Sequence, residues 1–186
     1  MLDSFYNKGF FNPKQVKRLN KFIESKYSHI EKAANTARNE DGTSKKKSKT
    51  LIIYRRHLKE IIPMLETYVH YVNDNYFGYD LYPFNDHDVC LYNIYESSNQ
   101  GGYDYHVDTS RSDVYDFKLT ILVNLSNQSF EGGKFYIFNG GEYEAEEVNQ
   151  PGTVLMFKSY LNHKVSTVIA GQRKTLTFFA RGPRLK

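Results

Sequence analysis

The sequence has no tryptophan and only one cysteine, Cys90, among its 186 residues. A single cysteine excludes an internal disulfide bond and any zinc site built from several cysteines. A metal held by this chain must therefore be bound by histidine and carboxylate side chains. No hydrophobic run approaches the roughly 18 residues of a membrane span, and residues 1–14 lack the apolar stretch of a secretory signal. These absences predict a soluble cytoplasmic protein without a membrane partner.

The composition, 40% hydrophobic and 25% charged, is that of a folded chain, and its length predicts a single domain over residues 1–186. The net charge of +4 is distributed unevenly. Residues 1–60 contain 15 Lys and Arg against 6 Asp and Glu, whereas residues 61–186 contain 10 against 15. A basic segment is one mark of nucleic-acid binding, but no zinc finger, glycine-rich phosphate loop or RNA-stacking motif accompanies it. We therefore expect solvated lysines rather than a nucleic-acid partner.

The first 87 residues show helical periodicity around a polar stretch. After a short strand, Asn12 and Pro13 suit the start of a helix in which Val16, Leu19, Phe22 and Ile23 recur on one face. Residues 34–50 are polar and rich in lysine, which predicts a mobile loop. A second helix is predicted over residues 56–76, and Pro63 favours a start at Ile61 because proline is tolerated only in the first turn.

From about residue 88 the periodicity changes to two, which is typical of strands. Turn sequences containing glycine separate short runs rich in β-branched and aromatic residues. Eight strands are predicted, over residues 89–95, 103–107, 118–125, 134–138, 142–148, 153–157, 163–168 and 173–180. Helices followed by so many short strands predict an α+β fold, with residues 1–87 supporting an antiparallel sandwich or barrel formed by residues 88–182.

Two histidines and one aspartate have the spacing of a metal site. On an extended segment His106 and Asp108 face the same side, so both can reach one ion. His163, on a later strand, would complete a set of two histidines and one carboxylate, which leaves positions on iron for a chelating cosubstrate and oxygen. The other histidines are expected in the core or at the surface: His29, His57, His70 and His87.

Several motifs surround these three residues in a fixed order. They are Tyr103-x-x-His106-x-Asp108, Gly132-Gly133 and Pro151-Gly152 each before a strand, His163-x-Val165, and Arg173 ten residues after His163. With this order, residues 91–182 resemble the iron(II)/2-oxoglutarate-dependent dioxygenases, specifically the prolyl 4-hydroxylase-like branch. The resemblance implies a double-stranded β-helix, or jelly roll, flanked by N-terminal helices.

The resemblance also implies residue roles. His106, Asp108 and His163 would bind iron(II), and Arg173 would pair with the far carboxylate of 2-oxoglutarate, since a guanidinium suits a carboxylate. Three further residues are expected at the cosubstrate: Tyr95, Thr177 and Asn124, the last standing where oxygen-sensing members have a tyrosine. Residues 36–50 are expected to form a lid over the substrate, with the lysines Lys45, Lys46 and Lys47.

The predicted activity is a 2-oxoglutarate- and iron(II)-dependent hydroxylase, with ascorbate as a reductant and a prolyl residue of a peptide or protein as substrate. The alternatives are hydroxylation of another side chain, a free amino acid or a small metabolite. Outside this reaction, the alternatives are oxidation of a nucleic acid and a non-catalytic jelly-roll module that holds a structural metal. An arginine anchor for a second carboxylate argues against that last alternative, since a structural metal site has no use for it.

Overall fold

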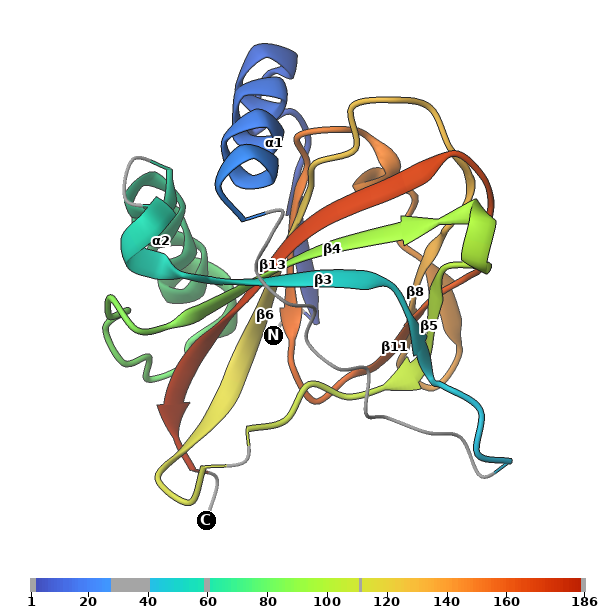
Figure 1. Cartoon of the computed structure of the whole chain (residues 1–186). Helices are drawn as coiled ribbons and strands as arrows, with labels where there is room; N and C mark the ends of the chain where they lie inside the picture. The colour runs from blue at the N-terminus through green and yellow to red at the C-terminus, as the bar shows by residue number, and fades with distance from the viewer. Residues whose placement is uncertain (1–2, 28–40, 59–60, 111, 185–186) are drawn as a thin grey trace.

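The computed structural model describes residues 3–27, 41–58, 61–110 and 112–184, which form two main β-sheets and two α-helices (Figure 1). The six-stranded sheet has the order β1 (Ser4–Asn7), β10 (Val154–Lys158), β6 (Tyr115–Asn124), β13 (Gln172–Pro183), β4 (Val89–Glu96), β3 (Lys49–Tyr54). The five-stranded sheet has the order β2 (Lys46–Lys47), β5 (Gly102–His106), β11 (Asn162–Val165), β8 (Phe135–Phe138), β9 (Glu142–Glu144). A third sheet pairs β7 (Glu131–Gly132) with β12 (Val168–Ala170). This arrangement confirms the predicted jelly-roll core flanked by helices.

The helix α1 (Pro13–Tyr27) begins where the sequence predicted. The Asn12 side-chain oxygen accepts from the Gln15 backbone N–H at 3.0 Å, and the Gln15 side chain accepts from the Asn12 N–H at 2.8 Å. Two N–H groups that a helix start leaves unpaired are satisfied by this reciprocal cap. The second helix, α2 (Ile62–Val72), has Pro63 in its first turn and continues as a π-helical turn over Asn73–Phe77.

The two helices pack on one face of the six-stranded sheet, and the other face turns toward the five-stranded sheet. Alternation along the strands decides which residue goes where. In β13, Leu176 and Phe178 belong to the hydrophobic cluster under the helices. Thr175 and Thr177 line a cavity between the sheets instead. The interior face of the jelly roll is therefore the polar face of this strand.

Two motif glycines occupy positions that a larger residue would not tolerate. Gly152 has φ +80°, and a Cβ there would lie 1.9 Å from the Phe11 carbonyl oxygen. Gly132 has φ +70°, and its Cβ would lie 2.1 Å from the Thr167 carbonyl oxygen. Both conformations are accessible mainly to glycine. The glycines of the motif therefore permit close backbone contacts in the β-core rather than binding a ligand.

Three predicted elements differ from the structure. The loop predicted over residues 34–50 is wrong from residue 46, because β2 and the first residues of β3 pair with β5 and β4 through backbone hydrogen bonds; residues 34–40 lie outside the described residues. The strand predicted over 142–148 ends at Glu144, and a 3₁₀ turn follows over Glu146–Asn149. The strand predicted over 163–168 is divided between β11 and β12.

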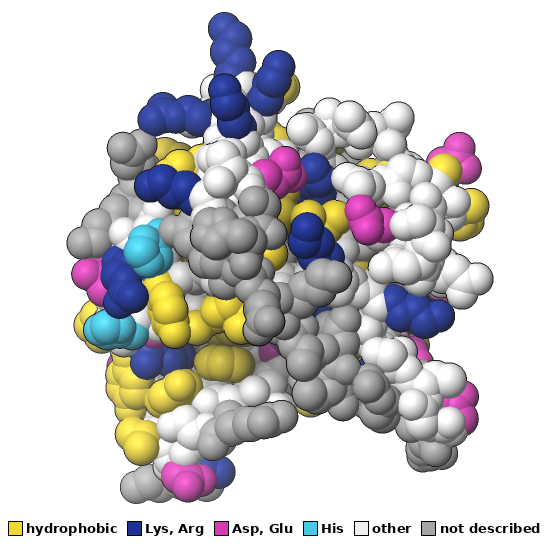
Figure 2. Space-filling model, in the orientation of Figure 1, with side chains coloured by type: hydrophobic (Ala, Val, Ile, Leu, Met, Phe, Trp, Pro, Cys, Tyr) yellow, Lys and Arg dark blue, Asp and Glu magenta, His cyan; other side chains and the backbone are white. Residues whose placement is uncertain are grey.

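Lysine and arginine side chains gather over α1 in Figure 2, where Lys14, Lys17, Arg18 and Lys21 are all exposed. Part of the N-terminal basic surplus thus lies on the outer face of a helix, as expected for solvated charges. Within the described residues, neither helix has the length and hydropathy that crossing a membrane requires. That the whole chain forms one domain stays a prediction, which the packing of both helices on the sheet supports.

Candidate metal centre

Two adjacent strands bring the three predicted metal ligands together. His106, the last residue of β5, lies opposite His163 of β11 in the strand register, and Asp108 follows two residues after His106. Nε2 of His106 lies 3.8 Å from Oδ1 of Asp108, and Nε2 of His163 lies 3.4 Å from Oδ2 of Asp108. One ligand atom from each residue lies within 4.8 Å of the others. The three side chains can therefore hold a single ion, as two imidazole nitrogens and one carboxylate oxygen.

Backbone carbonyl groups orient both imidazole rings. Nδ1 of His106 lies 2.8 Å from the Asp104 carbonyl oxygen, and Nδ1 of His163 lies 2.9 Å from that of Leu161. When Nδ1 carries the proton and donates it to the carbonyl, Nε2 is left with a free lone pair. Both Nε2 atoms face Asp108, so the rings present their ligating atoms toward the same point.

Asp108 is also held in place by its neighbours. Thr120 of β6 donates a hydrogen bond from Oγ1 to Oδ2 of Asp108 at 2.8 Å, and Oγ1 of Thr120 lies 3.0 Å from Oγ of Ser159. The backbone N–H of Asp108 donates to the Ser159 carbonyl at 3.0 Å. Such second contacts fix the orientation of a ligating carboxylate. Thr120 was not predicted from the sequence, although its place on the same face of β6 as Leu122 could have suggested it.

Burial of the three ligands favours a bound cation. Burial, with the neighbouring His163, lowers the pKa of His106 to about 3, so the ring is neutral at physiological pH. Burial raises the pKa of the Asp108 carboxyl, because the charged form loses its hydration. A divalent ion takes neutral imidazoles and a carboxylate as ligands, and its positive charge would stabilise the ionised form of the buried Asp108 carboxyl. The donor set therefore fits iron(II).

Aromatic rings enclose the centre. The ring of Tyr103 stacks on His106 with centroids 3.4 Å apart, and Phe157 meets His163 edge-on at 4.7 Å. The cavity between these side chains has a volume of about 50 Å³. It is lined by Lys46, Leu91, Asn93, Tyr95, Tyr103, His106, Asp108, Thr120, Leu122, Phe135, Phe157, His163, Val165, Thr175, Thr177 and Phe179. Aromatic and aliphatic side chains thus share the lining of this cavity with polar and charged ones.

Arg173 is fully buried, and its guanidinium group has no hydrogen-bond partner among the described residues. Its side chain is 0% exposed, and none of its three guanidinium nitrogens has a hydrogen-bond partner among the described residues. Burial lowers the pKa of Arg173 to about 10, and the ring of Tyr95, its register neighbour in β4, lies 5.8 Å from the guanidinium carbon. A buried cation without hydrogen bonds is costly. The site thus provides a fork of donors for a carboxylate that the chain itself does not supply.

The remaining predicted residues divide into two groups. Tyr95 and Thr177 line the metal cavity. Asn124 does not: its Nδ2 donates to the Val148 carbonyl at 2.7 Å, and its Oδ1 accepts from the Ser126 N–H at 2.8 Å. The structure therefore uses its amide to fix the turn after β6.

The three lysines predicted for a lid are also separated. Lys46 is inside the metal cavity, whereas Lys45 and Lys47 line a neighbouring cavity of about 420 Å³. Tyr103 and Val165 line both cavities. All three lysines were predicted to belong to the lid, and nothing in the sequence distinguished Lys46 from its two neighbours.

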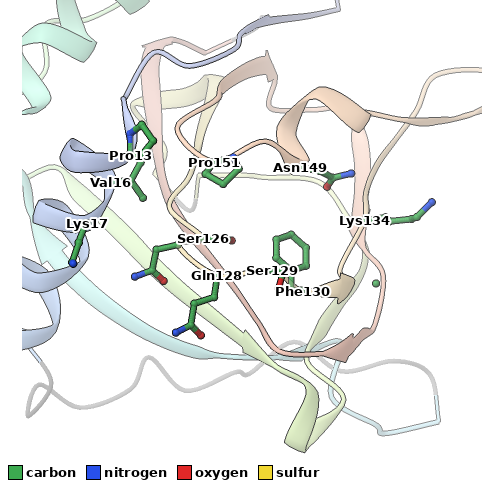
Figure 3. Close-up of a pocket in the computed structure, with 12 residues that line it drawn as sticks. Pro13, Val16, Lys17, Ser126, Gln128, Ser129, Phe130, Lys134, Asn149 and Pro151 are labelled. Atoms are coloured by element: carbon green, nitrogen blue, oxygen red, sulfur yellow. The ribbon is translucent and has the colours of Figure 1, made fainter.

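A larger cavity, of about 860 Å³, lies between α1 and the segment that follows β6 (Figure 3). Pro13, Val16 and Lys17 contribute from the helix, and Ser126 and Phe130 from the segment opposite. None of the site residues predicted from the sequence lines it. Metal chemistry therefore belongs to the smaller cavity between the sheets.

Comparison with solved structures supports the same fold. The chain superposes on a prolyl-4-hydroxylase from Pseudomonas putida with a TM-score of 0.69 and 17% identity, covering 98% of this chain and 94% of that one. For a viral collagen prolyl hydroxylase from Paramecium Bursaria Chlorella virus-1 the TM-score is 0.68 and the identity 15%, and the match covers 97% of each chain. For a prolyl hydroxylase from Trichoplax adhaerens, solved with a hypoxia inducible factor peptide, the TM-score is 0.70 and the identity 14%. The match covers 96% of this chain and 83% of that one. At these identities the likeness establishes the fold.

Comparison of sequences gives the family. No curated protein matches the chain. Residues 90–181, which include all three metal ligands and Arg173, match the family model described as the 2OG-Fe(II) oxygenase superfamily. Through these residues the chain belongs to the 2OG-Fe(II) oxygenase superfamily, with iron(II) as its metal and 2-oxoglutarate as its cosubstrate.

Proposed function

We propose that this protein hydroxylates a prolyl residue in a peptide or protein, using iron(II) and 2-oxoglutarate. The observation that carries the cosubstrate assignment is the guanidinium of Arg173, fully buried and without a hydrogen-bond partner. A planar fork of donors matches one carboxylate of a dicarboxylic acid. The prolyl substrate is supported by the likeness to three prolyl hydroxylases, one of them bound to a peptide.

In this proposal the metal ligands are His106 and His163 through Nε2 and Asp108 through its carboxylate. Arg173 holds the far carboxylate of 2-oxoglutarate, and Tyr95 and Thr177 contact the same molecule from β4 and β13. When bound, iron(II) and 2-oxoglutarate would supply, with molecular oxygen as the oxidant, the hydroxylation of an unactivated C–H bond: one oxygen atom would enter the new hydroxyl group, the other would enter succinate, and carbon dioxide would be released. The chain positions both groups and shields them with aromatic side chains.

Asn124 is excluded from direct contact in this assignment, since both ends of its amide are bonded within the fold. We assign it to positioning the backbone between β6 and the 3₁₀ turn at Glu146–Asn149. Ascorbate is proposed as the reductant that returns the iron to its divalent form.

For the substrate we propose the cavity of about 420 Å³ next to the metal centre. Thr43, Ser44, Lys45 and Lys47 form one wall, and residues 164–167 form another. A peptide lying there would pass Tyr103, which also lines the metal cavity. Of the lid predicted over residues 36–50, residues 36–40 lie outside the described residues; for the rest, we propose that residues 41–47 lie over the peptide, since Thr43, Ser44, Lys45 and Lys47 line this cavity.

The test is to supply the iron-reconstituted protein with labelled 2-oxoglutarate and proline-containing peptides. We expect release of labelled carbon dioxide, stimulated by a peptide that gains one oxygen on proline in mass spectra. Matched peptides with alanine in place of proline serve as the control. Decarboxylation that no prolyl peptide stimulates, but that a free amino acid or another side chain does, would contradict the prolyl substrate while leaving the reaction class intact.

A further inference from the structure

Lys46 is the one lysine of the described residues that lines the metal cavity. It lies in the edge strand β2, opposite Tyr103 of β5 in the register, and its neighbour Lys47 is exposed. Nζ of Lys46 lies 5.3 Å from the centre of the Tyr103 ring and donates to Oδ1 of Asn93 at 2.7 Å. Asn93 belongs to β4 of the other sheet. The ammonium group therefore bridges the two sheets beside the metal ligands.

The charge on Lys46 has no carboxylate partner within salt-bridge distance in the part of the chain that the structure describes. Three other lysine side chains are at most 13% exposed, and each has one: Lys118 with Asp116, Lys158 with Asp3, and Lys174 with Glu24. Lys46 instead donates to a neutral amide oxygen, which also accepts from Thr50 at 2.9 Å. Burial lowers the pKa of Lys46 to about 8, although the charge of Asp108, which is beyond salt-bridge distance, acts in the opposite direction.

Binding of the metal and cosubstrate does not remove this surplus. Iron(II) and doubly charged 2-oxoglutarate bring equal and opposite charges. Within the site, the positive Arg173 is balanced by the negative Asp108, and the two histidines act as neutral ligands. The loaded site therefore retains one positive charge, on Lys46. An ammonium has three N–H donors, and Asn93 accepts one of them, so two are free for a ligand.

We propose that Lys46 binds a carboxylate of the substrate adjacent to the prolyl ring that is hydroxylated. This inference rests on the proposed function and narrows its substrate to proline with a neighbouring acidic group. One carboxylate, with a single negative charge, would neutralise the one positive charge left on Lys46, whereas a doubly charged phosphate would leave a net negative charge. The carboxylate belongs either to an Asp or Glu next to the proline or to the proline itself at the C-terminus of a peptide.

Peptide binding without turnover tests the role of Lys46. The protein is loaded with iron(II) and 2-oxoglutarate under argon, and dissociation constants are measured by fluorescence anisotropy for three matched pairs of peptides. The pairs differ only in charge: Glu or Gln before the proline, Glu or Gln after it, and a C-terminal proline as free acid or amide. We expect at least one acidic peptide to bind tenfold or more tightly than its neutral partner, as for a hydrogen bond between two charged groups.

Variants of the protein test whether Lys46 causes the preference for the acidic over the neutral peptide. Lys46→Met should abolish it while the affinity for neutral peptides changes less than threefold, and Lys46→Arg should retain part of it. The matched control is Lys134→Met, beside β8 of the same sheet, where the lysine is paired with Glu144 and lines neither the metal cavity nor the proposed substrate cavity; it should keep the full preference. Hydroxylation of the same peptides should show the loss as a raised KM rather than a lowered kcat.

Each other outcome overturns a separate claim. Equal affinity for acidic and neutral peptides, or a preference that survives Lys46→Met, would overturn the role of Lys46 and leave the proposed function standing. An increased requirement for 2-oxoglutarate in Lys46→Met, with the peptide preference unchanged, would assign the lysine to the cosubstrate and also overturn the proposal. Failure of every peptide to bind would instead overturn the prolyl substrate on which the inference rests.

Discussion

The two faces of the six-stranded sheet are both buried, yet they differ in what they bury. The face under the helices is apolar, and its polar atoms are paired: the Tyr92 hydroxyl donates to Asn20 at 2.8 Å. The interior face carries Arg173, whose guanidinium group has no hydrogen-bond partner in the part of the chain that the structure describes. The first face contributes stability, and the second reserves unpaired groups for ligands at the expense of stability. Neighbouring residues of β13 belong to opposite faces, so the difference can be tested within one strand.

The largest effect is expected at the metal ligands. His163→Ala removes one of three donors, so iron bound per chain should fall from one to near zero and hydroxylation by at least about a thousandfold. The fold should survive, because the β-core around the site does not depend on an ion to close. Metal analysis after anaerobic reconstitution checks this, with the exposed His87→Ala as the control. Full iron occupancy in His163→Ala would disprove its role as a ligand.

Arg173→Met should separate binding from stability. The affinity for 2-oxoglutarate should fall by about a hundredfold or more, because a buried carboxylate would lose its charged partner. Without metal and 2-oxoglutarate, the free energy of unfolding of this variant should nonetheless exceed that of the wild type by about 1–3 kcal/mol, because the variant no longer buries a cation without hydrogen bonds. Calorimetry with 2-oxoglutarate and urea unfolding of the metal-free proteins measure the two effects. Unaltered 2-oxoglutarate binding would place the anchor elsewhere.

Leu176→Ala, on the other face of the same strand, should lower stability and leave ligand binding intact. Leu176 is 1% exposed in the cluster under the helices, so truncation should lower the free energy of unfolding by about 2–5 kcal/mol. Iron and 2-oxoglutarate should still bind at low temperature, where the variant stays folded. If Leu176→Ala weakened 2-oxoglutarate binding as much as Arg173→Met, the two faces would not be independent.

The smallest effect concerns an ion pair at the edge of the helix face. Burial of Glu24 opposes its charge, but hydrogen bonds from Lys174 and Tyr92 lower its pKa below the ordinary value. A lowered folded-state pKa gives stability that is present above about pH 4.5 and is lost as the pH falls through the folded-state value. Because the Glu24 side chain is 42% exposed, we expect less than about 1 kcal/mol. Urea unfolding between pH 6 and 3 should show a shallower decline for Glu24→Gln.

The interior face of β13 could be predicted from the sequence because a strand has a fixed alternation. Once Arg173 faces inward, Thr175 and Thr177 do so as well, and Leu176 faces the helices. His106 ends β5 and Asp108 lies in the segment just after it, so their common direction was predicted from the spacing of an extended chain, and the family resemblance supplied His163. Side-chain directions that depend on short spacing along one extended segment could therefore be predicted from the sequence.

The errors arise where position depends on a distant strand. Lys46 was assigned to a mobile loop because residues 45–47 have no apolar side chain, yet backbone pairing with β5 orders this segment. Asn124 was assigned to the cosubstrate by its position alone, whereas its amide bonds with Val148 and Ser126. Thr120 was missed because its contact with Asp108 joins β6 to the segment after β5, and these two strands belong to different sheets. Such contacts have no local signature.

The place of β13 in the sheet has a consequence for biosynthesis. It is the last strand in chain order, yet it lies in the middle of the sheet, between β6 and β4, rather than at an edge. Until residues 172–183 leave the ribosome, β4 and β6 cannot be joined, and both have unpaired edges. Arg173 arrives with this strand. A nascent chain can thus contain all three iron ligands while it still lacks the cosubstrate anchor and the centre of its sheet.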